Sequence, residues 1–184
     1  MTPQKNEFEV QATDRTTGNS YKAYITSNID SGNLNNLQVC DSKPNHFIIF
    51  PACDCDRNGN YARNTSWFYF RITGLPTGMK VTIEARRMNI LRAMYRCGWN
   101  IYRPCIKIGS EGKWYKIKER AILDVTDQNS VYAMFPITID FDNKETFIEI
   151  AFCFPYTYEE LMRDVEDMNL KYEQDKDIYF HRET

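Results

Sequence analysis

Histidine and cysteine are the residues of this chain that most often bind metal ions or act as nucleophiles. The 184-residue sequence has two His, His46 and His181, and six Cys. A catalytic zinc site usually takes three protein ligands from His, Cys and carboxylates. Neither His-x-x-Glu nor Cys-x-x-Cys occurs, and the spacing in Cys53-Asp54-Cys55 is not a standard one for a metal site. The sequence therefore predicts no metal site and two loop thiols at Cys53 and Cys55.

Covalent catalysis and cofactor binding are also not indicated. A Cys nucleophile needs a His base, but His46 lies in the apolar run 46–50 and His181 lies close to the end of the sequence. There is no glycine-rich phosphate loop of the Gly-x-Gly-x-x-Gly or Walker type. We expect free thiols in a reducing compartment. The six cysteines are Cys40, Cys53, Cys55, Cys97, Cys105 and Cys153.

Charge is distributed unevenly along the chain. Residues 71–120 hold 12 basic and 3 acidic side chains, whereas residues 121–184 hold 5 basic and 15 acidic ones. One interpretation is that the two segments neutralise each other within the fold. The other is that the basic segment presents a face to an acidic partner and attracts it electrostatically. The carboxylates of residues 121–184 are expected to lie mostly on solvated surface.

Five arginines are the candidate residues for binding an acidic partner. Arginine suits this role because its planar guanidinium can bind a carboxylate through two hydrogen bonds. Arg86 falls on the polar face of the strand expected at 81–85, so its guanidinium is expected to reach solvent. The five candidates are Arg86, Arg87, Arg92, Arg96 and Arg103.

Nucleic acid and membrane partners are not expected. The formal net charge of -2 lacks the basic excess of many nucleic-acid-binding proteins. No uncharged apolar run approaches the roughly 20 residues of a membrane-spanning helix. The first ten residues carry three charged side chains and no apolar core, so they do not resemble a secretory signal. We therefore expect a cytoplasmic protein.

Period-two alternation of apolar residues predicts a β-rich fold. Strands are expected at residues 46–50, 67–72, 81–85, 105–108, 114–117, 131–141 and 148–154. Pro136 indicates that 131–141 is an edge strand or carries a bulge, and residues 142–145 are expected to join it to 148–154 as a hairpin. Thr157-Tyr-Glu-Glu160 is a capping box, and apolar residues then recur at helical spacing, at Leu161, Val165, Met168 and Tyr172.

The predicted fold class is an antiparallel β-sandwich with a C-terminal amphipathic helix. Residues 1–24 are mostly polar and are interpreted as an N-terminal arm. Residues 25–156 are expected to form the sandwich, and residues 157–174 a helix packed on it. Residues 175–184 are interpreted as the start of a junction toward a further domain.

Three blocks of this sequence resemble one protein family. They are residues 31–34 (Ser-Gly-Asn-Leu), residues 64–72 (Asn-Thr-Ser-Trp-Phe-Tyr-Phe-Arg-Ile) and residues 150–158 (Ile-Ala-Phe-Cys-Phe-Pro-Tyr-Thr-Tyr) followed by Leu161. Together they resemble the N-terminal domain of the cytosolic carboxypeptidases, the tubulin-deglutamylating branch of the zinc carboxypeptidases. The resemblance covers roughly residues 25–184. It implies a β-sandwich beside a catalytic α/β domain that carries the zinc ligands and the catalytic residues.

Under this resemblance the chain itself contributes no catalytic, cofactor or metal residue. It implies a non-catalytic domain that supports the catalytic domain and partner binding, with zinc belonging to the missing catalytic domain of a parent enzyme. The implied partners are that neighbouring domain or the acidic tails of tubulin in microtubules, and the implied location is the cytoplasm, the cytoskeleton or the cilium. The end at residues 178–184 favours a fragment over the alternative, a stand-alone structural or adaptor protein of microtubules or cilia.

Overall fold

Short strands with alternating burial account for most of the chain in the computed structural model, which describes residues 6–53, 65, 67–97, 101–125, 131–138 and 147–173. The chain divides into two compact units, residues 1–154 and 155–184. The elements are β1 (Glu7–Thr13), β2 (Ser20–Thr26), β3 (Asn36–Val39), β4 (His46–Phe50), β5 (Tyr69–Thr73), β6 (Lys80–Ala85), α1 (Asn89–Arg96), β7 (Cys105–Ile108), β8 (Tyr115–Lys116), β9 (Ile122–Val125), β10 (Val131–Thr138), β11 (Phe147–Ala151) and α2 (Tyr158–Tyr172).

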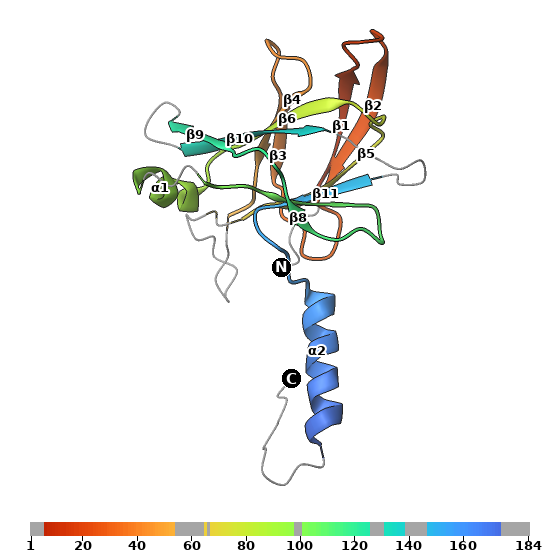
Figure 1. The fold of residues 1–184 in the computed structure, drawn as a ribbon, viewed down its shortest axis with the longest axis vertical. Coiled ribbons are helices and arrows are strands. Elements are labelled where there is room, and N and C mark those ends of the chain that lie inside the picture. The colour runs from red at the N-terminus through yellow and green to blue at the C-terminus, as the bar shows by residue number, and fades with distance from the viewer. Residues whose placement is uncertain are drawn as a thin grey trace. The chain divides into compact units, whose positions relative to one another are not determined.

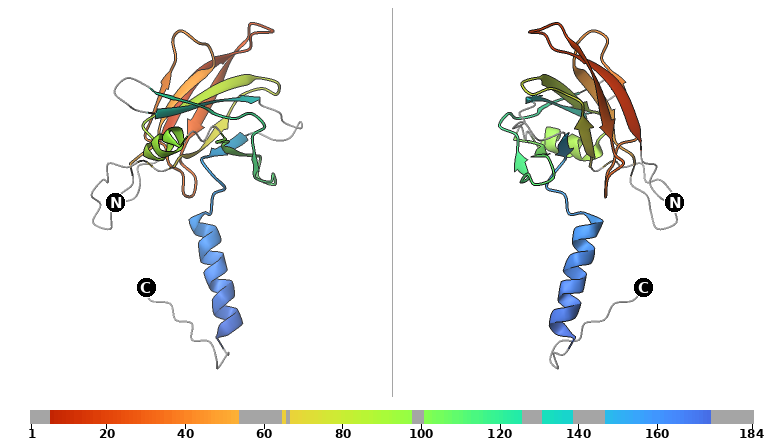
Figure 2. Two further views of the ribbon diagram at one scale, coloured as in Figure 1. Left: turned by 60° about the vertical axis from the view of Figure 1, so that its left-hand side comes forward. Right: turned by 90° about the vertical axis from the view of Figure 1, so that its right-hand side faces the viewer.

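The strands form two sheets that pack face to face (Figures 1 and 2). One sheet has the order β1-β2-β5-β11-β7-β8 and the other β3-β4-β6-β10-β9. Phe68, directly before β5, stacks on Phe135 of β10 in the opposite sheet, with ring centroids 6.1 Å apart. All strand pairs are antiparallel except β4 with β6, which is parallel. The predicted β-sandwich class is therefore confirmed.

The N-terminal residues were expected to form a polar arm, and for residues 7–13 and 20–24 this prediction is wrong. They lie in β1 and β2, which pair along their whole length at the edge of the six-stranded sheet. Val10 and Ala12 alternate with charged and polar residues and are buried, as are Ala23 and Ile25. Because each strand contributes only every second residue to the core, its average composition stays polar although it forms part of the sandwich.

The expected hairpin between 131–141 and 148–154 does not form. β10 pairs with β6 and β9, whereas β11 pairs with β5 and β7 in the other sheet. The connection therefore crosses between the sheets, and residues 142–145 lie outside the described part of the chain.

Pro136 lies in β10, which pairs with β6 on one side and β9 on the other. Of the two predicted alternatives, an edge strand or a bulge, the edge strand is therefore wrong. Pro136 is opposite Thr82 of β6, and the Thr82 N–H donates away from β10, to Asn45 O at 2.8 Å. The Pro136 nitrogen therefore points away from β6 and toward the β9 side of the strand. Pairing with β9 ends at Met134, so Pro136 has no β9 residue opposite it. The absence of an N–H at Pro136 therefore removes no hydrogen bond between β10 and β6.

Sequence patterns gave no element for residues 86–104, where the structure places α1. Met88, just before the helix, and Leu91 within it are buried. This segment leads from β6 in the five-stranded sheet to β7 in the six-stranded sheet. Apolar residues at 88 and 91 have helical spacing, but the arginines before and after them obscured that pattern.

The second unit contains the expected amphipathic helix, α2, with the expected capping box. The Thr157 hydroxyl accepts from the Glu160 N–H, and the Thr157 N–H donates to the Glu160 carboxylate at 2.7 Å. No residue of α2 is buried, and Leu161 and Met168 are each about 40% exposed. Packing of the helix on the sandwich therefore stays a prediction. No helix of the described residues is long and apolar enough to cross a membrane.

Two substitutions in α2 test that packing. If the stripe of Leu161, Val165 and Met168 packs on the sandwich, Val165→Asp buries a charge without a partner and should be the more destabilising change. Thr157→Ala removes only the cap and should cost about 0.5–2 kcal/mol. Thermal melts of the two variants give the comparison. A Val165→Asp variant as stable as Thr157→Ala would contradict packing.

Candidate functional site

The five candidate arginines all lie on the connection between β6 and β7, which contains α1. Arg87 and Arg96 are exposed, and Arg86 and Arg103 are half-buried. Arg92 belongs to α1, but its side chain lies outside the description. Residues 86–110 contain six basic side chains and no acidic one. The structure thus places the candidates on one crossing segment, and their binding role stays a prediction.

Arg86 is held by charged neighbours on the outer face of the five-stranded sheet. Its Nε donates to Glu84 Oε1 at 2.5 Å, and the other oxygen of Glu84 lies 2.7 Å from His46 Nε2. His46 and Glu84 are buried, whereas the Arg86 side chain remains 37% exposed. Part of the positive charge of Arg86 is therefore already balanced within the fold, and its remaining guanidinium donors lie at the surface.

Arg87 has an unusual backbone conformation. Its φ of 60° lies in the left-handed region, which costs a residue with a Cβ roughly 1 kcal/mol. Its guanidinium carbon lies 5.3 Å from the centroid of the Phe50 ring, a cation–π contact. The strained backbone and the ring contact together restrict where this exposed cation can point.

A second charged cluster lies on the outer face of the six-stranded sheet. Glu149 of β11 is opposite Arg71 of β5 and Lys107 of β7. Arg71 donates to Glu149 Oε1 from Nη2 at 2.6 Å and from Nε at 3.2 Å. Glu149 Oε2 lies 2.9 Å from Lys107 Nζ and accepts from the Tyr69 hydroxyl at 3.1 Å. We call Arg71, Lys107, Glu149 and Tyr69 the Glu149 cluster.

Glu149 itself is only 2% exposed, so the expectation of solvated carboxylates in residues 121–184 is wrong for this residue. Burial raises the pKa of Glu149, but the hydrogen bonds and charges of Arg71 and Lys107 outweigh burial and hold its pKa below the usual 4.5. The only feature of the sequence that could have revealed the cluster is a charged residue in the middle of each of three strands. It could not be used because the strand partners were unknown.

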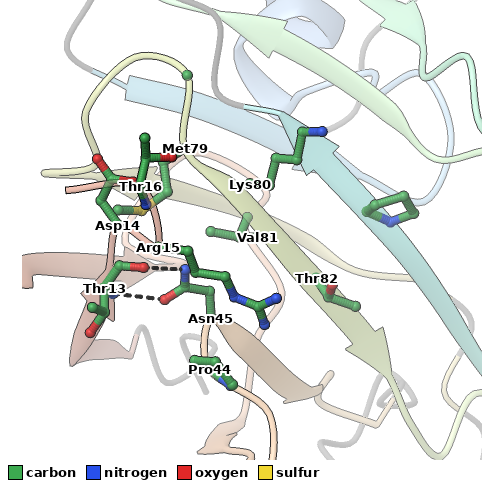
Figure 3. A pocket seen from close by; sticks show the side chains of 12 residues that line it. Thr13, Asp14, Arg15, Thr16, Pro44, Asn45, Met79, Lys80, Val81 and Thr82 are labelled. Carbon is green, nitrogen blue, oxygen red and sulfur yellow. Dashed lines mark hydrogen bonds between the residues drawn. The ribbon is translucent and has the colours of Figure 1, made fainter. Parts of the chain in front are cut away.

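A surface hollow of about 410 Å³ lies where the turn after β1 meets the start of β6 (Figure 3). Arg15 and Lys80 both line it. The side-chain amide of Asn45 accepts from the Thr13 N–H at 2.8 Å and donates to Thr13 O at 2.7 Å. Through these two bonds, the Asn45 side chain joins the last residue of β1 to the residue just before β4. The role of Asn45 is therefore structural.

The described residues offer no group of three His, Cys, Asp or Glu side chains placed to hold a metal ion. Asp54, Cys55 and His181 lie outside the described part of the chain. Cys105 is buried, and burial raises the pKa of its thiol to about 11, so this thiol is protonated and unreactive at neutral pH. The described residues therefore do not fit a zinc site.

Comparison with known proteins identifies the relatives of this chain. The chain is 23% identical to cytosolic carboxypeptidase-like protein 5 of Rattus norvegicus over 190 residues. This alignment covers 86% of this chain and 22% of that protein. It is 26% identical to cytosolic carboxypeptidase 6 of Homo sapiens over 132 residues, covering 70% of this chain and 24% of that protein. The chain thus spans about a quarter or less of these curated relatives.

A family model described as the cytosolic carboxypeptidase N-terminal domain matches residues 25–152. That match extends from the end of β2 to just beyond β11, so it includes most strands of the sandwich and the whole β6–α1–β7 connection. Because more than two thirds of the chain matches, the chain belongs to the cytosolic carboxypeptidase N-terminal domain family.

Proposed function

We propose that this chain is a non-catalytic binding and supporting domain of a cytosolic carboxypeptidase-type protein, and that it binds acidic protein tails. The observation that carries the proposal is the connection of residues 86–104 between β6 and β7, where five basic residues occur without one carboxylate. Two of its arginines, Arg87 and Arg96, are exposed. The acidic tails of tubulin are the proposed partner, and the cytoplasm is the proposed location.

Some basic residues of 71–120 form ion pairs within the fold, whereas Arg87 and Arg96 occur in no ion pair found among the described residues. Arg71 and Lys107 bind Glu149, and Arg86 binds Glu84. These pairs are consistent with the interpretation that the basic segment partly neutralises carboxylates of the same chain. Arg87 and Arg96 are exposed on the crossing connection, so a carboxylate from another molecule can reach them.

Microtubule co-sedimentation tests this function. We expect the chain to sediment with microtubules at low salt, and binding to fall as the Debye length shortens from about 10 Å at 0.1 M to about 3 Å at 1 M salt. Removal of the tubulin tails should abolish binding, because the tails supply the carboxylates. Arg92→Glu/Arg96→Glu should weaken binding by roughly tenfold or more, since each change replaces an attraction by a repulsion.

A matched control separates this surface from the general charge of the chain. Arg15→Glu/Lys80→Glu makes the same change in net charge at the hollow, next to the start of β6, whereas the arginine connection follows its end. This control variant should retain most of the binding. Equal losses in the two double variants, or binding that is indifferent to the tails, would contradict the proposed function.

A further inference from the structure

The hydrogen-bonding capacity of Glu149 is fully used, but that of its two cations is not. A carboxylate offers about four acceptor positions, and Glu149 receives two donors from Arg71, one from Lys107 and one from Tyr69. A guanidinium carries five N–H donors and an ammonium three. Two cations against one carboxylate leave the Glu149 cluster with one excess positive charge and with N–H groups that Glu149 cannot accept.

These remaining donors are within reach of solvent. The side chain of Arg71 is 32% exposed and that of Lys107 is 20% exposed, whereas Glu149 beneath them is 2% exposed. Aromatic rings flank both cations. The Arg71 guanidinium carbon lies 4.0 Å from the centroid of Phe147, and Lys107 Nζ lies 5.7 Å from that of Trp114. A partly apolar surrounding lowers the local dielectric constant and strengthens attraction to an anion.

We propose that Arg71 and Lys107 together bind a carboxylate of an acidic peptide, which completes a cluster of two cations and two anions. Arginine and lysine at this spacing supply both a planar donor pair and a point charge. The proposal concerns a different surface from the β6–β7 connection, because the cluster lies in the middle of β5, β11 and β7. It therefore holds or fails independently of the proposed function.

Among the described residues, the other charges on this face leave the excess in place. Glu7 of β1 belongs to the same cross-strand row, because it is opposite Thr26, which is opposite Arg71. Two strand spacings separate Glu7 from Arg71 by about 10 Å, roughly one Debye length at 0.1 M salt. On the other side, exposed Lys116 of β8 is opposite Cys105, two residues before Lys107, and adds positive charge.

Nuclear magnetic resonance of Trp114 gives a local measurement, because its ring lies beside Lys107. The full chain is titrated with an acetylated, amidated pentaglutamate peptide, and the Trp114 indole N–H signal is assigned with Trp114→Phe. We expect a saturable shift that a pentaglutamine peptide does not produce. Arg92→Glu/Arg96→Glu should leave this shift intact. A titration without a saturable Trp114 shift would overturn the proposal.

Two matched pairs of variants separate binding from fold support. Lys107→Gln should weaken binding about tenfold, whereas Lys113→Gln, which removes an exposed charge of the same sign, should change it about twofold or less. Glu149→Gln should weaken the fold yet tighten peptide binding several-fold, and more than Glu7→Gln does. If the Glu149 cluster only stabilises the fold, Glu149→Gln should not tighten binding of the pentaglutamate peptide.

The two lysine variants decide the outcome if Glu149→Gln does not fold. Thermal melts establish first that Lys107→Gln and Lys113→Gln are folded. Equal effects of these two variants on the Trp114 titration would overturn the proposal, since binding would then depend on total charge alone. A loss confined to Lys107→Gln would support it.

Discussion

Replacing Phe68 with alanine should lower the free energy of unfolding by about 3–5 kcal/mol. Phe68 has no exposed surface, and its ring contacts Phe70, Phe135 and Phe152 with centroids 5.9–6.1 Å apart. Because Phe135 belongs to the opposite sheet, the substitution opens a cavity between the two layers. A domain of this size is stable by only about 5–15 kcal/mol, so a large share of its stability would be lost.

Urea unfolding of the variant and the parent chain measures this loss. Phe154→Ala is the matched control, because the same side chain is truncated at a position that is 54% exposed. Its cost should be well below that of Phe68→Ala. Equal midpoints for the two variants would show that the Phe68 ring does not join the layers as the structure describes.

Strands could be predicted from the sequence where the alternation of apolar residues is pronounced, but β1, β2, β3 and β9 were missed. In β10, Val131, Ala133, Phe135 and Ile137 are all buried, and this pattern is visible in the sequence alone. Pairing between strands is not local, and there the predictions failed. Nothing within residues 131–154 indicates that β10 and β11 belong to different sheets. The sequences of β4 and β6 likewise do not indicate that these two strands pair in parallel.

The arginines of 86–103 could be chosen as candidates from residue type and local charge in the sequence, and their binding role stays a prediction. Which cations are already bound to carboxylates depends on register: Arg71, Lys107 and Glu149 are more than 30 residues apart and meet only because β5, β11 and β7 are neighbours. The interpretation that the basic segment neutralises carboxylates of residues 121–184 therefore holds for Arg71 and Lys107. Binding of an acidic partner by the arginines of 86–103 stays a prediction.

Removal of the Glu149 carboxylate should be among the most costly single changes in the chain. Glu149→Ala leaves Arg71 and Lys107 close together without their common anion, and breaking a buried ion pair in this way costs about 3–5 kcal/mol. The matched control is Glu9→Ala, whose ion pair with Lys22 is about half exposed on both sides. Exposed pairs contribute about 0–1 kcal/mol, so this control should unfold at nearly the parent midpoint.

The pH dependence of the stability lost in Glu149→Ala tests whether the charge of Glu149 causes that loss. The pKa of folded Glu149 lies below the usual value of 4.5, so its ionisation stabilises the folded state. The contribution is complete above about pH 4.5 and is lost as the pH falls through the folded pKa. The gap in unfolding free energy between the parent chain and Glu149→Ala should therefore be constant from pH 7 to about pH 5 and narrow below that. A gap that persists undiminished at acid pH would mean that Glu149 stabilises the sheet by packing, because protonation removes its charge but leaves its shape unchanged.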